Sequence, residues 1–174
     1  VYRSTAHLLD LGHTHIAMIN GRYGFTFSLH RDAGYRKALE EKGVVFDPDL
    51  VEHGDFTDEV GYRLAKKLLE QTPRPTAFVA GSMMTALGIY RAARSLGLTI
   101  GKDISVIAHD DVISFLSADN MVPSLTATRS SMRAAGKRSA DLLMDMLDGR
   151  VASDVHELWP VELILRETAV RAPK

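Results

Sequence analysis

Short apolar runs alternate with segments of helical period along the chain, and no other feature limits its possible folds as strongly. Residues 15–20 form a short apolar run typical of a buried strand. Val60, Leu64 and Leu68 recur at helical spacing behind Thr57, a residue suited to cap a helix. Strands that alternate with helices of this length predict an α/β fold with a mostly parallel, doubly wound sheet. The predicted strands are 15–20, 50–53, 76–80, 104–108, 125–129 and 157–166, and the predicted helices are 1–11, 29–42, about 58–68, 82–96, 112–116 and 131–147.

Composition excludes several classes of protein. The 174 residues carry a net charge of −1, so the chain lacks the basic excess of a free-standing nucleic-acid binder. There is no cysteine, which excludes disulfides, thiolate catalysis and cysteine-bound zinc and fits a reducing compartment. The longest mostly apolar stretch, residues 78–90, is too short to span a bilayer, and no signal peptide opens the chain. We therefore expect a cytoplasmic protein with no membrane partner.

The chain opens in a predicted helix, whereas an α/β domain usually opens with a strand. This order leads us to expect a segment of a longer protein.

Polar side chains follow each of the first four predicted strands. Ligands of open α/β sheets bind beyond the carboxyl ends of the strands, so these side chains are expected to meet at one edge. Carboxylate and guanidinium groups bind adjacent hydroxyls, and an aromatic ring covers the apolar face of a sugar. The set therefore suits a neutral polyhydroxylated ligand, although Asp55 and Ser82 could instead cap helices. The residues are Asn20, Gly21, Arg22, Arg31, Gly54, Asp55, Phe56, Gly81, Ser82, His109, Asp110 and Asp111.

Several motifs, in order and at matching spacing, resemble the LacI/GalR family over essentially the whole chain. Residues 7–19 resemble the family's leucine-glycine-histidine segment followed by isoleucine-alanine, and residues 30–39 its "R-x-x-G-y-x-x-A-L". Gly54-Asp-Phe-Thr57 is similar to its "G-D-f-t". Further matching segments are Arg74-Pro-Thr-Ala77, Ala86-Leu-Gly88, Asp103-Ile-Ser-Val106, Asp110-Asp111, Pro123-Ser-Leu-Thr126, Ala135-Gly136 and Leu163-Ile-Leu-Arg-Glu-Thr168.

The resemblance implies a periplasmic-binding-protein-like fold in which two α/β lobes close on a small effector. On this basis residues 1–14 are expected to be an element of the N-terminal lobe, and residues 15–124 the C-terminal lobe. Residues 125–150 are expected to return to the N-terminal lobe as a strand and a helix. Residues 151–174 are expected to supply a C-terminal-lobe strand and tail. The C-terminal lobe would be complete, the N-terminal lobe partial, and the helix-turn-helix headpiece absent.

The resemblance also implies site residues. Arg31 is similar to the family's effector-binding arginine, Phe56 to its stacking aromatic and Asp110 to its hydroxyl-binding carboxylate. Asn20 and Ser82 complete the expected effector site. The chain departs from the family pattern at Ser82-Met83, where Asn-Asp is usual, at His109, where an aromatic is common, and at Ala108, where glycine is. These departures leave the ligand's identity open. The expected dimer surface comprises Leu87, Tyr90 and Phe115.

The implied function is the effector-sensing and dimerisation domain of a transcriptional regulator. A small molecule, expected to be a sugar or glycoside, would favour a closed arrangement of the lobes and so control DNA binding by the headpiece. We expect a homodimer, contact with operator DNA only through the headpiece, and neither cofactor, metal nor catalytic residue.

Three alternatives stay open on the sequence alone. A solute-binding protein of a transporter would share the fold and the sugar chemistry. A hydrolase would use Ser82 in a strand-to-helix turn, although the second glycine of G-x-S-x-G is missing. His13 and His15 could chelate a metal, but no third ligand is near them in sequence, and a structural hydrogen bond is the simpler role.

Overall fold

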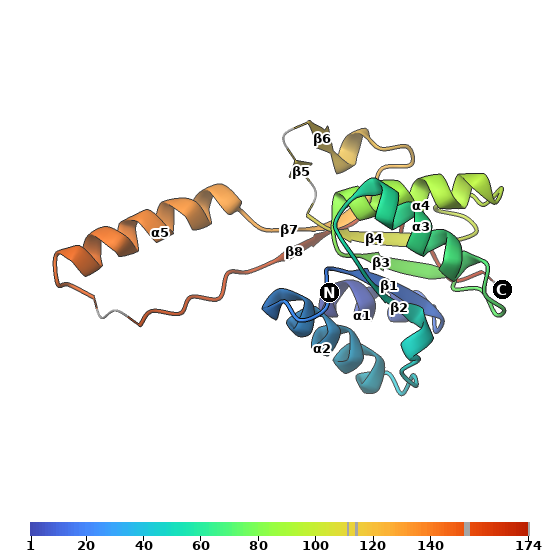
Figure 1. The fold of residues 1–174 in the computed structure, drawn as a ribbon, viewed down its shortest axis with the longest axis horizontal. Coiled ribbons are helices and arrows are strands. Elements are labelled where there is room, and N and C mark those ends of the chain that lie inside the picture. Colours follow the sequence, from blue (N-terminus) through green and yellow to red (C-terminus); the bar gives the residue numbers. More distant parts are fainter. Residues whose placement is uncertain (111, 114, 152–153, 174) are drawn as a thin grey trace.

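The structure is a computed structural model that describes residues 1–110, 112–113, 115–151 and 154–173. Its centre is a six-stranded sheet in the order β2-β1-β3-β4-β7-β8, parallel except for β8, which runs antiparallel to β7 (Figure 1). This arrangement confirms the predicted α/β fold with a mostly parallel sheet. The strands are β1 (Ile16–Asn20), β2 (Val51–His53), β3 (Ala77–Ala80), β4 (Ser105–His109), β7 (Thr126–Arg129) and β8 (Glu162–Ile164).

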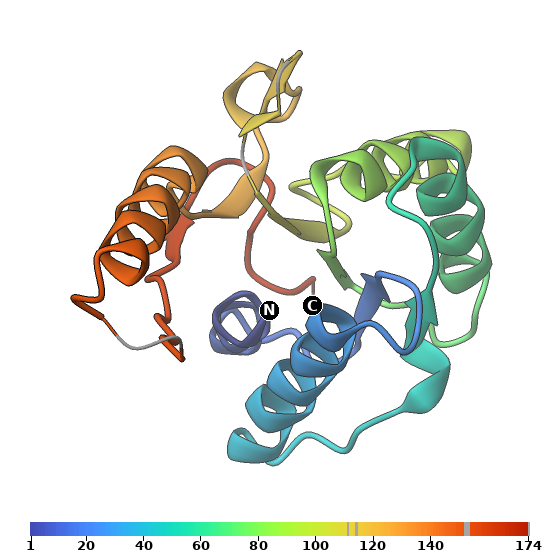
Figure 2. The same ribbon diagram turned by 60° about the vertical axis from the view of Figure 1, so that its left-hand side comes forward.

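Helices cover both faces of the sheet, as Figure 2 shows. Helices α1 (Tyr2–Asp10) and α2 (Thr26–Glu41) lie on one face, and α3 (Asp58–Leu69) and α4 (Met83–Ser95) on the other. Each face has its own apolar core, because neighbouring residues of a buried strand point to opposite faces. Ile16 and Met18 join the α1–α2 core, whereas Ala17 and Ile19 join the α3–α4 core.

Helices α3 and α4 approach each other through two glycines. A Cβ atom on Gly61 would lie 2.6 Å from the carbonyl oxygen of Thr85, and one on Gly88 would collide with the backbone of Asp58 and Tyr62. Only glycine therefore permits this separation of the two helices. The contact fixes the start of α4, which follows directly on the carboxyl end of β3.

The carboxyl-terminal tail is bound to the sheet by buried polar side chains. Thr168 donates from Oγ1 to the carbonyl oxygen of Val106 over 2.6 Å and accepts from the backbone N–H of Thr126 over 2.8 Å. His13 is 1% exposed, and its ring nitrogens lie 2.9 Å from Thr76 Oγ1 and 3.1 Å from Ser105 Oγ. The structural role predicted for this histidine is confirmed. No group of potential metal ligands occurs among the described residues.

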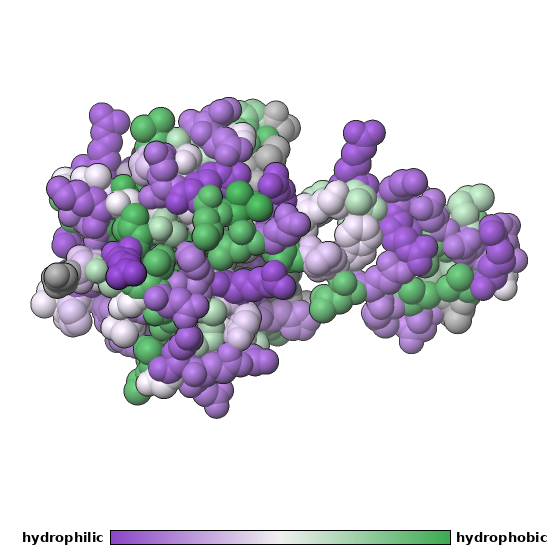
Figure 3. Space-filling model, turned by 180° about the vertical axis from the view of Figure 1, so that it is seen from behind, coloured by the Kyte–Doolittle hydropathy of each residue, from purple (hydrophilic) through white to green (hydrophobic). Residues whose placement is uncertain are grey.

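Helix α5 (Met132–Leu147) stands away from the rest of the molecule on two extended segments (Figure 1). None of its residues, all of which are described, is buried. Arg138 ties it to the returning segment through a bidentate ion pair with Glu157. Figure 3 shows one side of the part of the molecule that projects with α5, where apolar side chains lie among polar ones.

Two expectations about lobe membership differ from the structure. Residues 1–14 were expected in the other lobe, yet α1 packs on α2 and buries Leu8 in the same core as β1. Its apolar side chains thus pack on the same sheet as α2. Strand β7 was expected to return to the other lobe with its helix. It pairs instead with β4 in the main sheet, and only α5 stands apart.

The predicted helix at 112–116 is also wrong. Val112–Ile113 (β5) and Leu116–Ser117 (β6) pair as antiparallel strands. Valine and isoleucine favour extended backbone, and so short a segment cannot offset the cost of starting a helix. Among the described residues, no helix combines the length and the apolar character needed to cross a membrane.

Candidate functional site

Arg31 and two phenylalanines form a compact cluster at the carboxyl ends of β1, β2 and β3. The guanidinium carbon of Arg31 lies 5.2 Å from the ring centre of Phe27 and 5.3 Å from that of Phe56. Its Nη1 donates to the carbonyl oxygen of Gly81 over 3.1 Å. Burial lowers the pKa of Arg31, and the nearby charge of Asp110 opposes that shift. The structure thus brings together two side chains that the sequence predicted, Arg31 and Phe56.

Two glycines make room for the Phe56 ring. A Cβ atom on Gly81 would lie 2.5 Å from a ring carbon of Phe56, and one on Gly21 would lie 2.9 Å from another. Because real Cβ atoms essentially never approach so closely, any side chain at either position would displace the ring. The glycines after β1 and β3 therefore determine where this aromatic face lies.

Asp110 follows β4 with a left-handed backbone conformation, at a φ of 64°. Its carboxylate lies 3.4 Å from Nε2 of His109, and the side chain is 44% exposed. His109 also lies 3.0 Å from Thr128 Oγ1, and burial lowers its pKa. A carboxylate held beside a guanidinium and open to solvent can accept hydrogen bonds from ligand hydroxyls. Asp111 lies outside the described residues.

Asn20, which was expected in the effector site, is buried and hydrogen-bonded within the protein. It is 1% exposed, and its Nδ2 donates to the carbonyl oxygen of Ser28 over 2.9 Å and to Asp32 Oδ1 over 2.8 Å. Its Oδ1 accepts from the N–H of Gly21. Every polar atom of the amide is thus used within the protein, so Asn20 positions the turn after β1.

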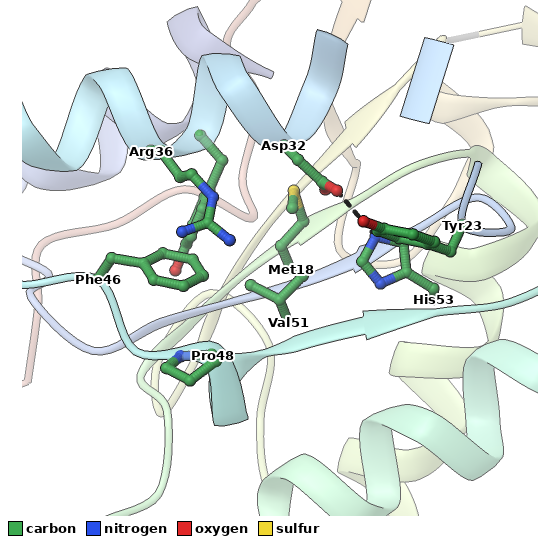
Figure 4. Close-up of a pocket in the computed structure, with 9 residues that line it drawn as sticks. Met18, Tyr23, Asp32, Arg36, Phe46, Pro48, Val51 and His53 are labelled. Atoms are coloured by element: carbon green, nitrogen blue, oxygen red, sulfur yellow. Dashed lines mark hydrogen bonds and ion pairs between the residues drawn. The ribbon is translucent and has the colours of Figure 1, made fainter. Parts of the chain in front are cut away.

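Asp32 extends this network to the neighbouring strand (Figure 4). Its Oδ2 lies 3.0 Å from Nε2 of His53, at the end of β2. The pair borders a cavity of about 150 Å³ between α2 and β2, where Arg36 stacks on Phe46 with its guanidinium carbon 3.4 Å from the ring centre. Arg31 and Asp32 are consecutive on α2, so the network fixes the helix that carries Arg31 and the strand that leads to Phe56.

Ser82 caps helix α4. Its Oγ accepts from the backbone N–H of Thr85 over 3.1 Å and lies 3.1 Å from the Thr85 hydroxyl. The sequence left open whether Ser82 caps a helix, and these contacts are those of a helix cap. Thr57 caps α3 in the same way, so Asp55 is not a cap and pairs with Arg22 instead.

Beyond Phe56 the surface is hollowed over a volume of about 220 Å³. Its lining includes Gly21, Gly54 and three phenylalanines, Phe25, Phe27 and Phe56. The ion pair of Arg22 and Asp55 lies at the rim, and its hydrogen bonds lower the pKa of Asp55.

Residues 5–169 match a family described as periplasmic binding protein-like domain. The chain belongs to this family. Its relatives include the HTH-type transcriptional regulator AglR of Rhizobium meliloti (strain 1021), which is 45% identical over 172 residues that cover 99% of this chain and 48% of AglR. The chain thus spans about half the length of the curated relatives it matches.

Two solved structures of regulators share the fold. A transcriptional regulator CelR–cellobiose complex aligns with a TM-score of 0.86 and 31% identity over 94% of this chain and 49% of that one. A lac repressor dimer bound to operator and the anti-inducer ONPF aligns with a TM-score of 0.86 and 29% identity over 97% of this chain and 49% of that one. The resemblance to LacI/GalR regulators is confirmed, and these relatives are transcriptional regulators rather than enzymes.

Within this periplasmic-binding-protein-like domain, sequence reasoning missed Phe25 and Phe27. The predicted helix began at residue 29, whereas α2 begins at Thr26. The available signal was a pair of aromatics two residues apart, soon after the predicted strand 15–20. Residues that follow the carboxyl end of a parallel strand are where ligands of such sheets bind.

The expected dimer residues fall into two groups. Leu87 and Tyr90 are partly buried against the α3–α4 core, and the Tyr90 hydroxyl donates to the carbonyl oxygen of Pro123 over 2.7 Å. Burial raises the pKa of this phenol. Phe115, beside the β5–β6 hairpin, is 75% exposed.

Proposed function

We propose that the chain is the effector-binding and dimerisation part of a longer LacI/GalR-type transcriptional regulator, with a small sugar or glycoside as effector. The observation that carries this proposal is the cluster of Arg31, Phe27, Phe56 and Asp110 at the carboxyl ends of the strands. It offers a guanidinium, a carboxylate and aromatic faces within one small region. That combination binds adjacent hydroxyls and the apolar face of a sugar ring.

The opposite charges of Arg31 and Asp110 favour a neutral effector. When a sugar binds, its hydroxyls replace the water around this pair, and no charge is added. We propose that the protein acts by binding alone, since the Ser82 hydroxyl, the nucleophile that a hydrolase would need, serves as the cap of α4. The arrangement thus supports a sensor more than a hydrolase.

Helix α5 supports the view that a second lobe completes the effector site. Its exposed apolar side chains need a partner surface, and the two extended segments that carry it provide a crossing between lobes. We assign α5 to that second lobe, and the six-stranded sheet with α1, α2, α3 and α4 to the first. An effector bound between the lobes would favour their closed arrangement and so alter the separation of two DNA-binding headpieces in a cytoplasmic dimer.

The dimer surface is proposed to include Phe115 and the exposed side of α4 near Leu87 and Tyr90. A large exposed aromatic beside a partly buried apolar helix is typical of an interface centre.

The test is isothermal titration of the full-length protein with neutral mono- and disaccharides. Arg31→Met and Asp110→Asn each remove a charge-assisted contact, so we expect the affinity for the bound sugar to fall by about tenfold to a hundredfold. Arg36→Met is the matched control, because Arg36 also lies on α2 and stacks on a phenylalanine but faces the other side. Unchanged affinity in both site variants would refute the assignment.

A second measurement separates the regulator from a transport protein. The full-length protein should retard DNA from upstream of its own gene in a gel-shift assay, and the bound sugar should change the midpoint of that titration. Sugar binding without any DNA binding would favour the transport alternative.

A further inference from the structure

We propose that the hollow formed by Phe25, Phe27 and Phe56 is a second ring subsite, and that the effector is a neutral disaccharide whose outer ring stacks there. The inference rests on the proposed sugar-sensing function and narrows its ligand class. One ring would lie against Arg31 and Asp110, and the other would lie in the hollow.

The first support is the exposed aromatic platform. The rings of Phe25 and Phe27 are stacked, with centroids 5.6 Å apart and planes at 15°. They are 52% and 44% exposed, although burying a phenylalanine side chain is normally favourable. A stacked, exposed aromatic pair next to a ligand site is a flat apolar surface that a sugar ring can cover.

The platform is continuous with the inner site. Phe27 lies 5.9 Å from Phe56, and both rings flank the guanidinium of Arg31. A ligand that touches Arg31 therefore extends onto Phe27 and Phe25 without crossing a polar gap. Arg31 and Phe27 lie in the first turn and a half of α2, and Phe25 directly precedes that helix.

Size favours one ring in the hollow and another at the inner site. Pockets that enclose a drug-sized ligand measure about 300–1,000 Å³. The hollow measures about 220 Å³, so it accommodates part of such a ligand. The other ring of the ligand would then bind to Arg31 and Asp110.

Charge favours a neutral ligand over a sugar phosphate. At the rim, Arg22 Nη2 donates to Asp55 Oδ2 over 2.8 Å, so its positive charge is already compensated. The charge of Asp110 also acts on the guanidinium of Arg31. A phosphate would therefore meet a carboxylate near each of these two cations, whereas a neutral hydroxyl can exchange hydrogen bonds with carboxylate and guanidinium alike.

The experiment compares matched sugars on the full-length protein by isothermal titration. Glucose is set against maltose, cellobiose and trehalose, galactose against lactose and melibiose, and glucose 6-phosphate serves as the charged probe. We expect one disaccharide to bind at least about tenfold more tightly than its monosaccharide, in keeping with the added stacking contact. Phe25→Ala should remove most of that difference, because it weakens the binding of the disaccharide much more than that of the monosaccharide.

Tyr23→Ala is the matched control, because Tyr23 is another exposed aromatic of the same loop but lies edge-on to His53, outside the hollow. It should leave every affinity unchanged, and Phe25→Trp should retain the preference for the disaccharide. A thermal unfolding curve for each variant verifies its fold.

The outcomes distinguish this inference from the proposed function. Equal affinity for monosaccharides and disaccharides, or equal weakening of both by Phe25→Ala, overturns the second subsite and leaves the sugar sensor intact. Tightest binding of glucose 6-phosphate overturns the neutral ligand. If no sugar binds to the full-length protein, the proposed function itself fails and the inference fails with it.

Discussion

At the scale of single residues, neighbours decide whether a polar side chain serves a ligand or the fold. Asn20, Ser82 and Arg31 all lie near the carboxyl end of the sheet. Asn20 forms its hydrogen bonds at the turn after β1, and Ser82 forms its hydrogen bonds at the start of α4. Arg31 keeps part of its guanidinium between two rings and beside Asp110. Residue type alone could not separate these roles, because the difference lies in contacts between distant parts of the chain.

His13 leads to a prediction about pH. Burial lowers its pKa below the ordinary value of 6.5, so the folded protein holds fewer protons there than the unfolded chain. Its contribution to stability is therefore complete above about pH 6.5 and is lost as the pH falls below that value. We expect the free energy of unfolding, measured with urea, to decrease from pH 7 to pH 5.

The variant His13→Gln isolates this effect. Its free energy of unfolding should be lower at pH 7 and should depend less on pH than that of the original chain. His109, whose pKa is also lowered by burial, accounts for part of the remaining slope, and His109→Gln measures that part. If His13→Gln had the same slope as the original chain, the buried imidazole would not be the source.

At the scale of elements, the long helices and the strands β1, β2, β3, β4 and β7 lie close to their predicted positions, whereas β8 and residues 112–116 differ from the prediction. Helix α3 has both its predicted cap and its buried stripe. The strand predicted at 157–166 shrinks to β8, Glu162–Ile164, because only those residues find a partner in β7. The segment at 112–116 forms a hairpin instead of a helix. Strands and hairpins depend on partners that a local pattern does not specify.

Because α3 and α4 cross closely at Gly88, a larger side chain at this position should destabilise the fold. Gly88→Ala would place a Cβ atom against the backbone of α3, and overpacking of this kind costs about 1–3 kcal/mol. Urea denaturation of the chain measures the loss. The matched control is Gly136→Ala on α5, where the Cβ atom meets open space, so greater helix propensity should stabilise that helix by about 0.5–1 kcal/mol. A neutral Gly88→Ala would mean that the helices can separate at little cost.

At the scale of the whole molecule, one lobe has two complete cores while α5 has none. Met132, Leu143, Met144 and Leu147 are 56–75% exposed on that helix. An apolar helix face exposed to water is stabilised when another surface covers it. A surface that covers these side chains would therefore stabilise α5.

A double variant, Leu143→Gln with Leu147→Gln, tests that dependence. In the 174-residue chain, it should weaken concentration-dependent association, as measured by analytical ultracentrifugation. In the full-length protein, where we propose that a second lobe covers α5, it should lower the free energy of unfolding by about 1–3 kcal/mol per leucine. Lys137→Gln, a polar position on the same helix, should change neither quantity. An unaffected full-length protein would contradict the assignment of α5 to the second lobe.

The sequence by itself determined the class of fold and the family, and it predicted that Arg31 and Phe56 lie at the same edge of the sheet. It could do so because periodicity, helix caps and ordered motifs are local features. Tertiary structure alone decided the rest. It packed α1 on the sheet through the burial of Leu8, and it turned Asn20 inward. It also brought Phe25 and Phe27 next to Phe56. Each of these outcomes depends on which surfaces meet once the sheet has formed, and contacts between residues distant in the chain leave no periodic trace in the sequence.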